Sequence, residues 1–361
     1  MVNGVRSIGA AILIGFAAML AACSSETERA GVEKSEFDIG WSIYAGWMPW
    51  PYADQAGIVD KWEEKFGIEI NFVQVNDYVE SVNQYTAGQL DGVTVANMDA
   101  LTIPAAGGKD TSAIIVGDYS NGNDGILVKN AAEVSALEDS EVYLVELSVS
   151  HYLLARALET AGMPMSAVRT VNTSDADIAG AFSSPQVGAA VAWNPQLMTM
   201  REEPGANLVF SSADIPGEIV DLLVVDTATL EANPDLGRAL AGIWYETMAL
   251  MQQDDEEGRA ARAAMASLAG TTPDLFERQL ETTYLYTDPA DAVAATTDAA
   301  LVETMTRVRD FSFAQGLFGQ GARSADAVGM AFPGGRTLGD PDNVTLRFDA
   351  TFMQMAADGE L

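Results

Sequence analysis

Residues 141–163 read EVYLVELSVSHYLLARALETAGM and contain the pattern that decides the fold. The run 142–147 is short and mostly apolar, which predicts a strand buried on both faces of a parallel sheet. Ser148 and Ser150 follow as residues able to cap a helix, and apolar residues then recur at helical spacing until Gly162. The segment therefore predicts a strand followed by a helix.

A second apolar run at 168–171 predicts the strand that completes a β-α-β unit. The first loop of this unit carries Glu146, two serine hydroxyls and the N-terminus of the helix. In open α/β sheets, small molecules bind at this position, beyond the carboxyl ends of the strands. The unit therefore predicts an α/β protein with a small-molecule site.

The rest of the chain predicts more α/β structure and then a helical C-terminal part. Strands are expected at 68–72, 93–95, 112–116, 188–192 and 219–225, and helices at 53–66, 77–89 and 175–182. Two prolines and a glycine in 45–52 predict an irregular loop. Further helices are expected at 236–251, 258–268, 273–282, 289–313 and 346–357.

The first 23 residues resemble a lipoprotein signal peptide. Arg6 precedes an apolar run at 8–20 that is too short to be a stable membrane anchor, and Leu20-Ala21-Ala22-Cys23 resembles a lipobox. We expect Cys23 to carry the lipid and residues 24–35 to form a flexible tether. The alternative is an ordinary secretory signal with a chance cysteine.

The composition excludes several classes of function. The formal net charge is −33, from 52 acidic and 19 basic residues. Nucleic acid is an unsuitable partner, because each phosphate contact needs Lys or Arg. One histidine, His151, and one cysteine provide neither a metal cluster nor a catalytic thiol, and no Walker A motif is present. We therefore predict no cofactor, no metal and no catalysis, with His151 in a structural role.

Three blocks occur in order: Ser148-x-Ser150-His151-Tyr152-Leu153-Leu154-x-Arg156-Ala157-Leu158-Glu159-x-Ala161-Gly162, the stretch 175–182, and Ala192-Trp193-Asn194-Pro195. Together they resemble the solute-binding proteins of nitrate, sulfonate and taurine ABC importers. The likeness extends from about residue 41 to residue 225. Within that family, Gly46-Trp47-Met48-Pro49-Trp50 and Ile215-Pro216-Gly217-Glu218 resemble the branch associated with urea or guanidine import.

This resemblance implies the type II periplasmic-binding-protein fold, an α/β architecture of two Rossmann-like lobes joined by a two-segment hinge. Lobe I is expected at 36–127 plus 226–361, and lobe II at 128–225. The resemblance also implies a monomer that captures a small-molecule solute and delivers it to an ABC permease and its ATPase. Such a protein works in the periplasm or at the outer face of the cytoplasmic membrane, here held by the lipid on Cys23.

Indole rings, carboxylates and small polar groups near predicted strand ends are the candidates for the ligand site. They are Trp47, Trp50, Asp99, Asp118, Asn121, Glu146, Ser148, Trp193, Glu218 and Asp221. Structural roles also fit several of them: either tryptophan of the 45–52 loop fits the core, Asp99 fits a helix cap, and Asp118 and Asn121 fit turns. A buried Asp221 requires a partner, either a basic side chain or a cationic ligand.

The surplus of carboxylates indicates the charge of the solute. Several carboxylates around one cleft repel an anion, whereas a planar guanidinium donates paired N–H groups to carboxylates and stacks on tryptophan. We therefore expect a small planar cationic or urea-like solute, with guanidine as the first choice. The alternatives are an aliphatic sulfonate, nitrate or similar small anion held by Ser148 and Ser150, and a thiamine-pyrimidine-type enzyme of the same fold.

Overall fold

The computed structural model describes residues 34–361. The predicted signal peptide with Cys23, and residues 24–33 of the predicted tether, lie outside the described residues. Within the described part, none of the helices is both long and apolar enough to cross a bilayer.

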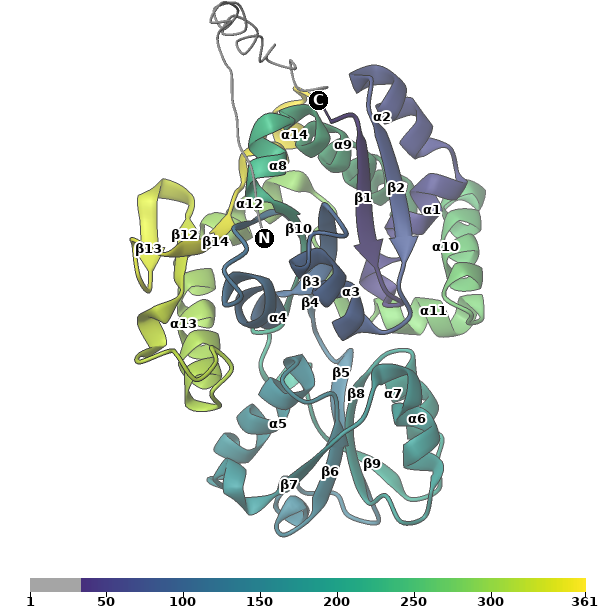
Figure 1. Cartoon of the computed structure of the whole chain (residues 1–361). Helices are drawn as coiled ribbons and strands as arrows, with labels where there is room; N and C mark the ends of the chain where they lie inside the picture. Colours follow the sequence, from purple (N-terminus) through teal and green to yellow (C-terminus); the bar gives the residue numbers. More distant parts are fainter. Residues whose placement is uncertain (1–33) are drawn as a thin grey trace, which may run out of the picture. The chain divides into compact units, whose positions relative to one another are not determined.

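The larger of two sheets has nine strands in the described residues (Figure 1). Its order is β13-β12-β14-β4-β10-β3-β1-β2, and β11 pairs with β4. The strands are β1 (Glu36–Trp41), β2 (Glu69–Gln74), β3 (Gly92–Ala96), β4 (Thr111–Ser120), β10 (Val220–Asp226), β11 (Thr283–Leu285), β12 (Gly329–Phe332), β13 (Arg336–Leu338) and β14 (Val344–Phe348). β10 runs antiparallel to both of its neighbours, β3 and β4. Residues of these three strands therefore lie side by side in fixed register.

The smaller sheet has the order β7-β6-β8-β5-β9. Its strands are β5 (Asp124–Lys129), β6 (Glu141–Leu144), β7 (Arg169–Asn172), β8 (Ala189–Trp193) and β9 (Ala206–Ser211). β6 and β7 are parallel and are connected by helix α5 (Val149–Thr160). This confirms the β-α-β unit predicted from residues 141–163, although β6 ends at Leu144 rather than at Leu147.

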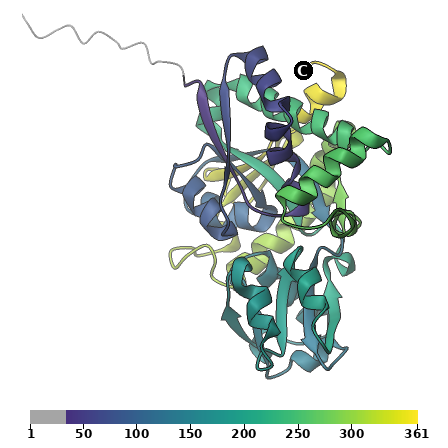
Figure 2. The same cartoon turned by 90° about the vertical axis from the view of Figure 1, so that its right-hand side faces the viewer.

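Helices flank both sheets. Those of the smaller sheet are α5 on one side and α6 and α7 on the other (Figure 1). C-terminal helix α14 lies at the end of the larger sheet that is remote from the smaller sheet (Figures 1 and 2). The remaining helices are α1 (Pro49–Gln55), α2 (Ile58–Phe66), α3 (Tyr78–Thr86), α4 (Asn97–Ala100), α6 (Asp175–Ser183), α7 (Gln196–Arg201), α8 (Thr227–Ala232), α9 (Pro234–Met251), α10 (Glu256–Leu268), α11 (Pro273–Leu280), α12 (Pro289–Thr297), α13 (Ala299–Ala314) and α14 (Thr351–Asp358).

The chain passes between the sheets twice, from β4 to β5 and from β9 to β10. Because β10 belongs to the larger sheet, the return crossing precedes Val220, a few residues before the expected lobe boundary at residue 225. The lobe boundaries themselves stay a prediction. The two crossings place residues 118–124 and 212–221 beside the gap between the sheets, and these segments supply much of the site described below.

Two predictions near the N-terminus were wrong in detail. Residues 45–52 are not irregular, because a 3₁₀ turn, Ala45–Trp47, leads into helix α1. Pro49 occupies the first turn of α1, where the missing proline N–H is tolerated. The expected helix at 53–66 is interrupted because Gly57 adopts a φ of 73°, a left-handed conformation that ends α1 and redirects the chain into α2.

The C-terminal part is not wholly helical. Strands β11 to β14 were missed, and the expected helix at 346–357 is strand β14 followed by α14. The expected helix at 289–313 is two helices, since Asp298 is extended and accepts the backbone N–H of Ala300 as the cap of α13. β4 also extends to Ser120, so Asp118 lies inside the strand rather than after it.

Candidate functional site

A small internal cavity is lined by residues from both sheets. Water can occupy about 20 Å³ of it, which is room for one or two molecules. The lining residues are Tyr44, Trp47, Tyr78, Ala96, Asn123, Asp124, Val149, Trp193, Ile219 and Asp221. Trp47, Trp193 and Asp221, three of the predicted site residues, are therefore brought together from three distant parts of the chain.

Four aromatic rings form much of the cavity wall. Trp47 ends the 3₁₀ turn that follows β1, and its ring centroid lies 5.0 Å from that of Tyr44 and 5.7 Å from that of Tyr78. Trp193, the last residue of β8, approaches Tyr78 edge-on at 5.7 Å. All four rings are buried. Tyr44, Trp47 and Tyr78 come from segments that follow β1 and β2 of the larger sheet, and Trp193 comes from the smaller sheet, so a solute between the rings contacts both parts.

Two carboxylates face the cavity, Asp124 from the start of β5 and Asp221 from β10. Asp124 accepts a hydrogen bond of 2.6 Å from Ser120 Oγ. Burial raises the pKa of Asp124 to about 6, although hydrogen bonds from Ser120 and Asn123 offset part of the rise. Burial, together with the adjacent Asp118, raises the pKa of Asp221 well above its ordinary value.

Asp118 lies directly behind Asp221. The two residues are register partners on β4 and β10. Tyr44 donates its hydroxyl to Asp118 Oδ1 at 2.7 Å, whereas Asp118 Oδ2 is buried without a hydrogen-bond partner. Burial raises the pKa of Asp118, and the hydroxyl of Tyr44 and the proximity of Asp221 moderate this rise. A third residue, Gly46, packs so tightly here that a Cβ atom would lie 2.3 Å from Asp118 Oδ2.

Asp99 lies behind another wall residue. It accepts the hydroxyl of Tyr78 at 2.6 Å and is fully buried. Burial raises the pKa of Asp99 to about 7, while Tyr78 and the backbone N–H of Val149 offset part of that rise. Oδ1 of Asp99 nevertheless makes no hydrogen bond of ordinary geometry. Because Val149 begins α5, the carboxylate faces the first turn of that helix across the gap between the sheets.

Asn123 is the clearest unsatisfied group on the wall. Its side chain is fully buried, and neither its oxygen nor its nitrogen makes a hydrogen bond of ordinary geometry. It lies close enough to Asp124 to lower the pKa of that carboxyl slightly. Trp47 Nε1 is likewise buried without a partner. Buried polar groups are almost always satisfied in folded proteins, so these atoms of the wall are free to bond a ligand or a water molecule.

The electrostatic character of the cavity follows from its composition. None of the ten lining residues, all within the described range, is Lys, Arg or His. Asp99 and Asp118 add two more buried carboxyl groups immediately behind the wall. The cavity is therefore acidic and aromatic, and no basic side chain lines it to attract an anion.

Three predicted residues occupy other positions. Trp50 is buried in the hydrophobic core beside the larger sheet, where its ring centroid lies 4.8 Å from that of Trp244 and 5.3 Å from that of Phe72. Asn121 uses its backbone N–H to bond the carbonyl of Thr282 and does not line the cavity. Glu146 accepts a hydrogen bond from Thr170 and is likewise absent from the wall.

Ser148 and Glu218 also lie off the wall. Ser148 caps α5 by accepting the backbone N–H of Ser150. Glu218 accepts hydrogen bonds from Arg156 at 2.8 Å and Tyr152 at 2.5 Å, and Arg307 lies 3.5 Å away. Burial acts to raise the pKa of Glu218, but these partners outweigh it, and the pKa falls below its ordinary value. Glu218 thus joins α5, the return crossing and α13.

His151 supports the loop that precedes α5. Its Nδ1 accepts the backbone N–H of Leu147 at 3.3 Å, and its ring lies edge-on to Phe311. Burial lowers the pKa of His151. This geometry agrees with the loop hydrogen bond expected from the sequence.

Sequence reasoning missed seven residues of the wall, of which four are polar or aromatic: Tyr44, Tyr78, Asn123 and Asp124. Asn123 and Asp124 sit in a run dense in turn-forming residues, and such a run gives no separate signal for a ligand. Tyr44 could have been predicted as a site residue, because it is aromatic and follows the end of a strand closely. Tyr78 begins α3 directly after its cap, Asp77, and reads as an ordinary helix residue.

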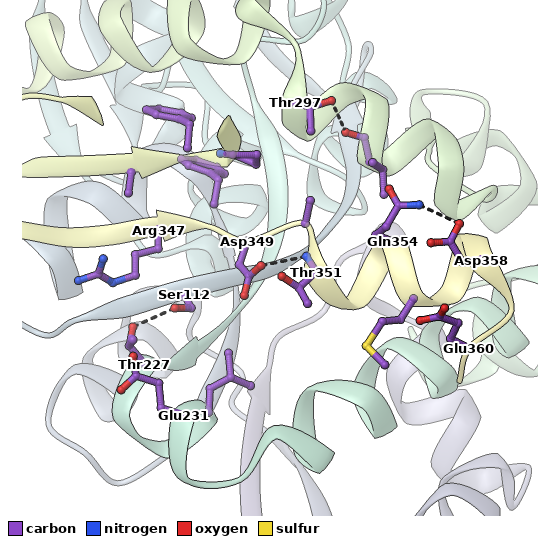
Figure 3. A pocket seen from close by; sticks show the side chains of 18 residues that line it. Ser112, Thr227, Glu231, Thr297, Arg347, Asp349, Thr351, Gln354, Asp358 and Glu360 are labelled. Carbon is purple, nitrogen blue, oxygen red and sulfur yellow. Dashed lines mark hydrogen bonds between the residues drawn. The ribbon is translucent and has the colours of Figure 1, made fainter. Parts of the chain in front are cut away.

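A second, larger hollow of about 660 Å³ lies on the surface beside α14, between α8, α12 and β14 (Figure 3). Several of its polar groups are already paired. Arg347 binds Asp110, Ser112 bonds Thr227 at 2.9 Å, and the side chain of Gln354 bonds Asp358 at 3.0 Å. Because the hollow is open, whereas the internal cavity gathers buried carboxyl groups and aromatic rings, we place the candidate site in the internal cavity.

The model of one protein family, described as NMT1/THI5 like, matches residues 61–258. The chain belongs to the NMT1/THI5-like family. The matched segment runs from α2 into α10, so it includes every strand of the smaller sheet and most of the cavity wall. Tyr44 and Trp47 precede it. No curated protein matches significantly.

Solved structures share the fold of this family member. The alkanesulfonate-binding protein SsuA from Xanthomonas axonopodis pv. citri, bound to MOPS, aligns with a TM-score of 0.67 and 18% identity over 80% of this chain and 96% of its own. The aliphatic sulphonate-binding protein SsuA from Escherichia coli gives 0.65 and 18% over 79% and 94%. The nitrate-binding protein NrtA from Synechocystis PCC 6803 gives 0.56 and 12% over 91% and 99%.

These likenesses establish the type II periplasmic-binding-protein fold expected from the sequence. The family model establishes the NMT1/THI5-like family but not the narrower urea- or guanidine-associated branch that residues 46–50 and 215–218 resemble.

Proposed function

We propose that this protein is the extracytoplasmic solute-binding component of an ABC importer, and that its cargo is a small planar cation, guanidinium. The family and the fold support the transport role, since the matched structures include sulfonate- and nitrate-binding proteins. The partners are then a permease and its ATPase, with Cys23 as the lipid anchor and the protein a monomer. Closure of two lobes over the solute would signal occupancy to the permease.

The pair Asp124 and Asp221 in a cavity lined by no basic residue carries the choice of a cation. A buried carboxylate without a partner is costly, and an entering cation supplies that partner. Guanidinium donates paired N–H groups to carboxylates in planar geometry. Each such charge-assisted hydrogen bond contributes roughly 1.5–3 kcal/mol, about tenfold to a hundredfold in affinity. Urea has the same shape but no charge, so it should bind more weakly.

The aromatic wall and the small size of the cavity support the same cargo. A guanidinium face stacks on indole or phenol rings, and a desolvated cation–π contact contributes about 2 kcal/mol. The 20 Å³ open to water fits a solute of few atoms better than an aliphatic sulfonate. The unsatisfied oxygen of Asn123 is a further acceptor for an N–H donor.

An anionic cargo is the second candidate, because the matched structures include sulfonate- and nitrate-binding proteins and α5 presents its N-terminus near the cavity. Ser150 Oγ is buried there without a partner, and a helix N-terminus favours anions. Asp99 faces the same first turn, however, so its carboxylate competes with any anion for that position. The enzyme alternative is less favoured, because the matched structures include solute-binding transport proteins.

Isothermal titration calorimetry tests the proposal directly. The purified protein is titrated at pH 7.5 and constant ionic strength with guanidinium chloride, urea, taurine and nitrate. We expect guanidinium to bind at least tenfold more tightly than urea, and no heat from taurine or nitrate. Binding of taurine or nitrate without a response to guanidinium would overturn the cation assignment, and turnover of any of these compounds would overturn the transport assignment.

A pair of charge-removing variants locates the binding. Asp221→Asn removes a carboxylate of the cavity, while Glu360→Gln removes one from the exposed hollow beside α14. We expect the first to weaken guanidinium binding by tenfold or more and the second to leave it unchanged. Equal effects would show that the overall charge, rather than the cavity, determines binding.

A further inference from the structure

Asp118 and Asp221 form a buried carboxyl pair with no compensating positive charge. They are opposite one another on β4 and β10, with 0% and 6% of their surface exposed. Among the ion pairs in the described residues, none includes either carboxyl. One oxygen of Asp118 is bonded to Tyr44 and the other has no partner.

The groups that surround the pair are acidic or neutral. Asp124 faces it from β5, Tyr44 from the turn after β1, and Tyr78 from the start of α3. Tyr286, just beyond β11, is also within electrostatic range of Asp118. The pKa values of these tyrosines are all raised, chiefly by burial, so they stay neutral. Tyr44 and Tyr78 donate their hydroxyls to Asp118 and Asp99. No neighbouring group therefore offsets a double negative charge.

Two buried carboxylates in contact cannot both ionise at moderate cost, because burial and mutual repulsion both disfavour the second charge. Such a pair retains one proton, which titrates as a property of both groups. The raised pKa of each member agrees with this physical expectation.

We propose that Asp118 and Asp221 share one proton in the empty site and that this proton leaves when the cation enters, so that the site exchanges one cation for one proton. This inference rests on the proposed function. The carboxyl O–H bond breaks, the proton passes to the solvent, and the electron pair stays on the carboxylate. The incoming N–H donors then bond that carboxylate, and the charge of the site is unchanged by loading.

Through this exchange, the site selects cationic solutes over neutral solutes of the same shape. Asp221 contacts the cavity, and Asp118 is the residue behind it that fixes how many protons the pair holds. A neutral solute of the same shape does not displace the proton. It must therefore bind a pair in which the O–H of the protonated carboxyl is already used as a donor. The sign of the pH dependence follows. Affinity for the cation falls as the pH drops, by up to tenfold per unit once the pair is protonated, whereas an anion would bind more tightly.

The number of protons released is measured by calorimetry at pH 6.5 in several buffers of different ionisation enthalpy. Guanidinium chloride is the ligand, and the slope of observed enthalpy against buffer ionisation enthalpy gives the proton count. We expect a release near one proton in the wild type, the same value in Glu360→Gln, and less than half a proton in Asp118→Asn. Binding with a slope near zero in the wild type would overturn the exchange while leaving the proposed function standing.

Infrared difference spectroscopy of the wild type gives a second reading that needs no variant. Adding guanidinium should remove the C=O band of a protonated carboxyl and add carboxylate bands, and an unchanged carboxyl band would overturn the exchange. Failure of guanidinium to bind at all, with binding of taurine or nitrate, would overturn the proposed function itself and the exchange with it.

Discussion

Replacement of Asp124 by Asn separates the stability of the empty protein from its affinity for a cation. The substitution keeps the shape of the side chain, and the amide oxygen of Asn still accepts the hydrogen bond that Ser120 Oγ donates to Asp124. What is lost is the negative charge at the cavity wall. We expect the variant to be more stable than the wild type near neutral pH and to bind guanidinium more weakly.

The expected gain in stability follows from the raised pKa of Asp124. Burial lifts it from 3.8 to about 6, a difference of about 2 units, and each unit corresponds to about 1.4 kcal/mol. An acid whose pKa is raised in the folded state destabilises that state where it ionises, so the cost is absent below pH 3.8 and complete above about pH 6. Asn avoids this cost, so the empty variant should gain up to about 3 kcal/mol at pH 7.5 and nothing near pH 3.5.

The expected loss of affinity is the value of one charge-assisted hydrogen bond. Removal of the Asp124 charge should cost roughly 1.5–3 kcal/mol, or about tenfold to a hundredfold in Kd for guanidinium. Urea also donates to that carboxylate but carries no charge of its own, so its loss should be smaller, and the preference for guanidinium over urea should shrink.

Two calorimetric measurements check both expectations. Differential scanning calorimetry at pH 7.5 should show a melting temperature higher by a few degrees in Asp124→Asn, and a difference that disappears toward pH 3.5. Titration calorimetry at pH 7.5 gives the two affinities, with Glu360→Gln as the control. A variant less stable than the wild type at pH 7.5, with guanidinium affinity within threefold, would refute the reasoning, because Asp124 would then be a structural residue.

Three other variants probe the surroundings of the cavity. Gly46→Ala places a Cβ 2.3 Å from Asp118 Oδ2 and should weaken guanidinium binding tenfold or more by titration calorimetry, whereas Gly180→Ala meets no atom within 4 Å and should leave binding unchanged. Glu218→Gln removes the negative charge that Arg156 and Arg307 share, although Arg156 keeps its ion pair with Glu159, and should lower the unfolding free energy by about 1.5–3 kcal/mol, the value of a charge-assisted hydrogen bond. Because the pKa of Glu218 is lowered, the difference from wild type should vanish in acid below that pKa, as thermal unfolding at several pH values would show. Trp193→Leu should reduce guanidinium affinity about thirtyfold, the equivalent of about 2 kcal/mol, and an affinity within threefold would remove the indole from the site.

Local patterns explain which parts of the fold were predictable. The β-α-β unit around α5 was predicted because its apolar period changes from strand to helix within a short stretch and serine marks the cap. Strands β12 and β13 were missed because each has only three or four residues and turn-forming residues lie between and around them. α1 was missed because proline was treated as a breaker, whereas Pro49 begins the helix.

The candidate site was less predictable, because it depends on register between distant strands. Asp221 was recognised as an acid inside an apolar strand that needs a partner, but only the pairing of β10 with β4 puts Asp118 beside it. Glu218 and Trp50 carry the right chemistry for a cation site, yet Glu218 pairs with arginine and Trp50 packs in the core. Residue type and strand-end position therefore predicted three residues of the cavity wall, Trp47, Trp193 and Asp221, while the rest of the wall required the tertiary structure.

The position of Asp99 bears on the proposal that a fold shared with sulfonate- and nitrate-binding proteins accepts a cation. The N-terminus of a helix attracts negative charge, and in this protein the carboxyl of Asp99, in α4, lies at the start of α5. In its ionised form Asp99 occupies the position that an external anion would need. In the proposed function, an external cation is the partner of the two carboxyl groups that line the cavity, Asp124 and Asp221. Asp99→Asn removes the carboxylate that competes with an external anion for the helix N-terminus. A gain in nitrate or taurine binding in that variant would identify Asp99 as the residue that excludes anions.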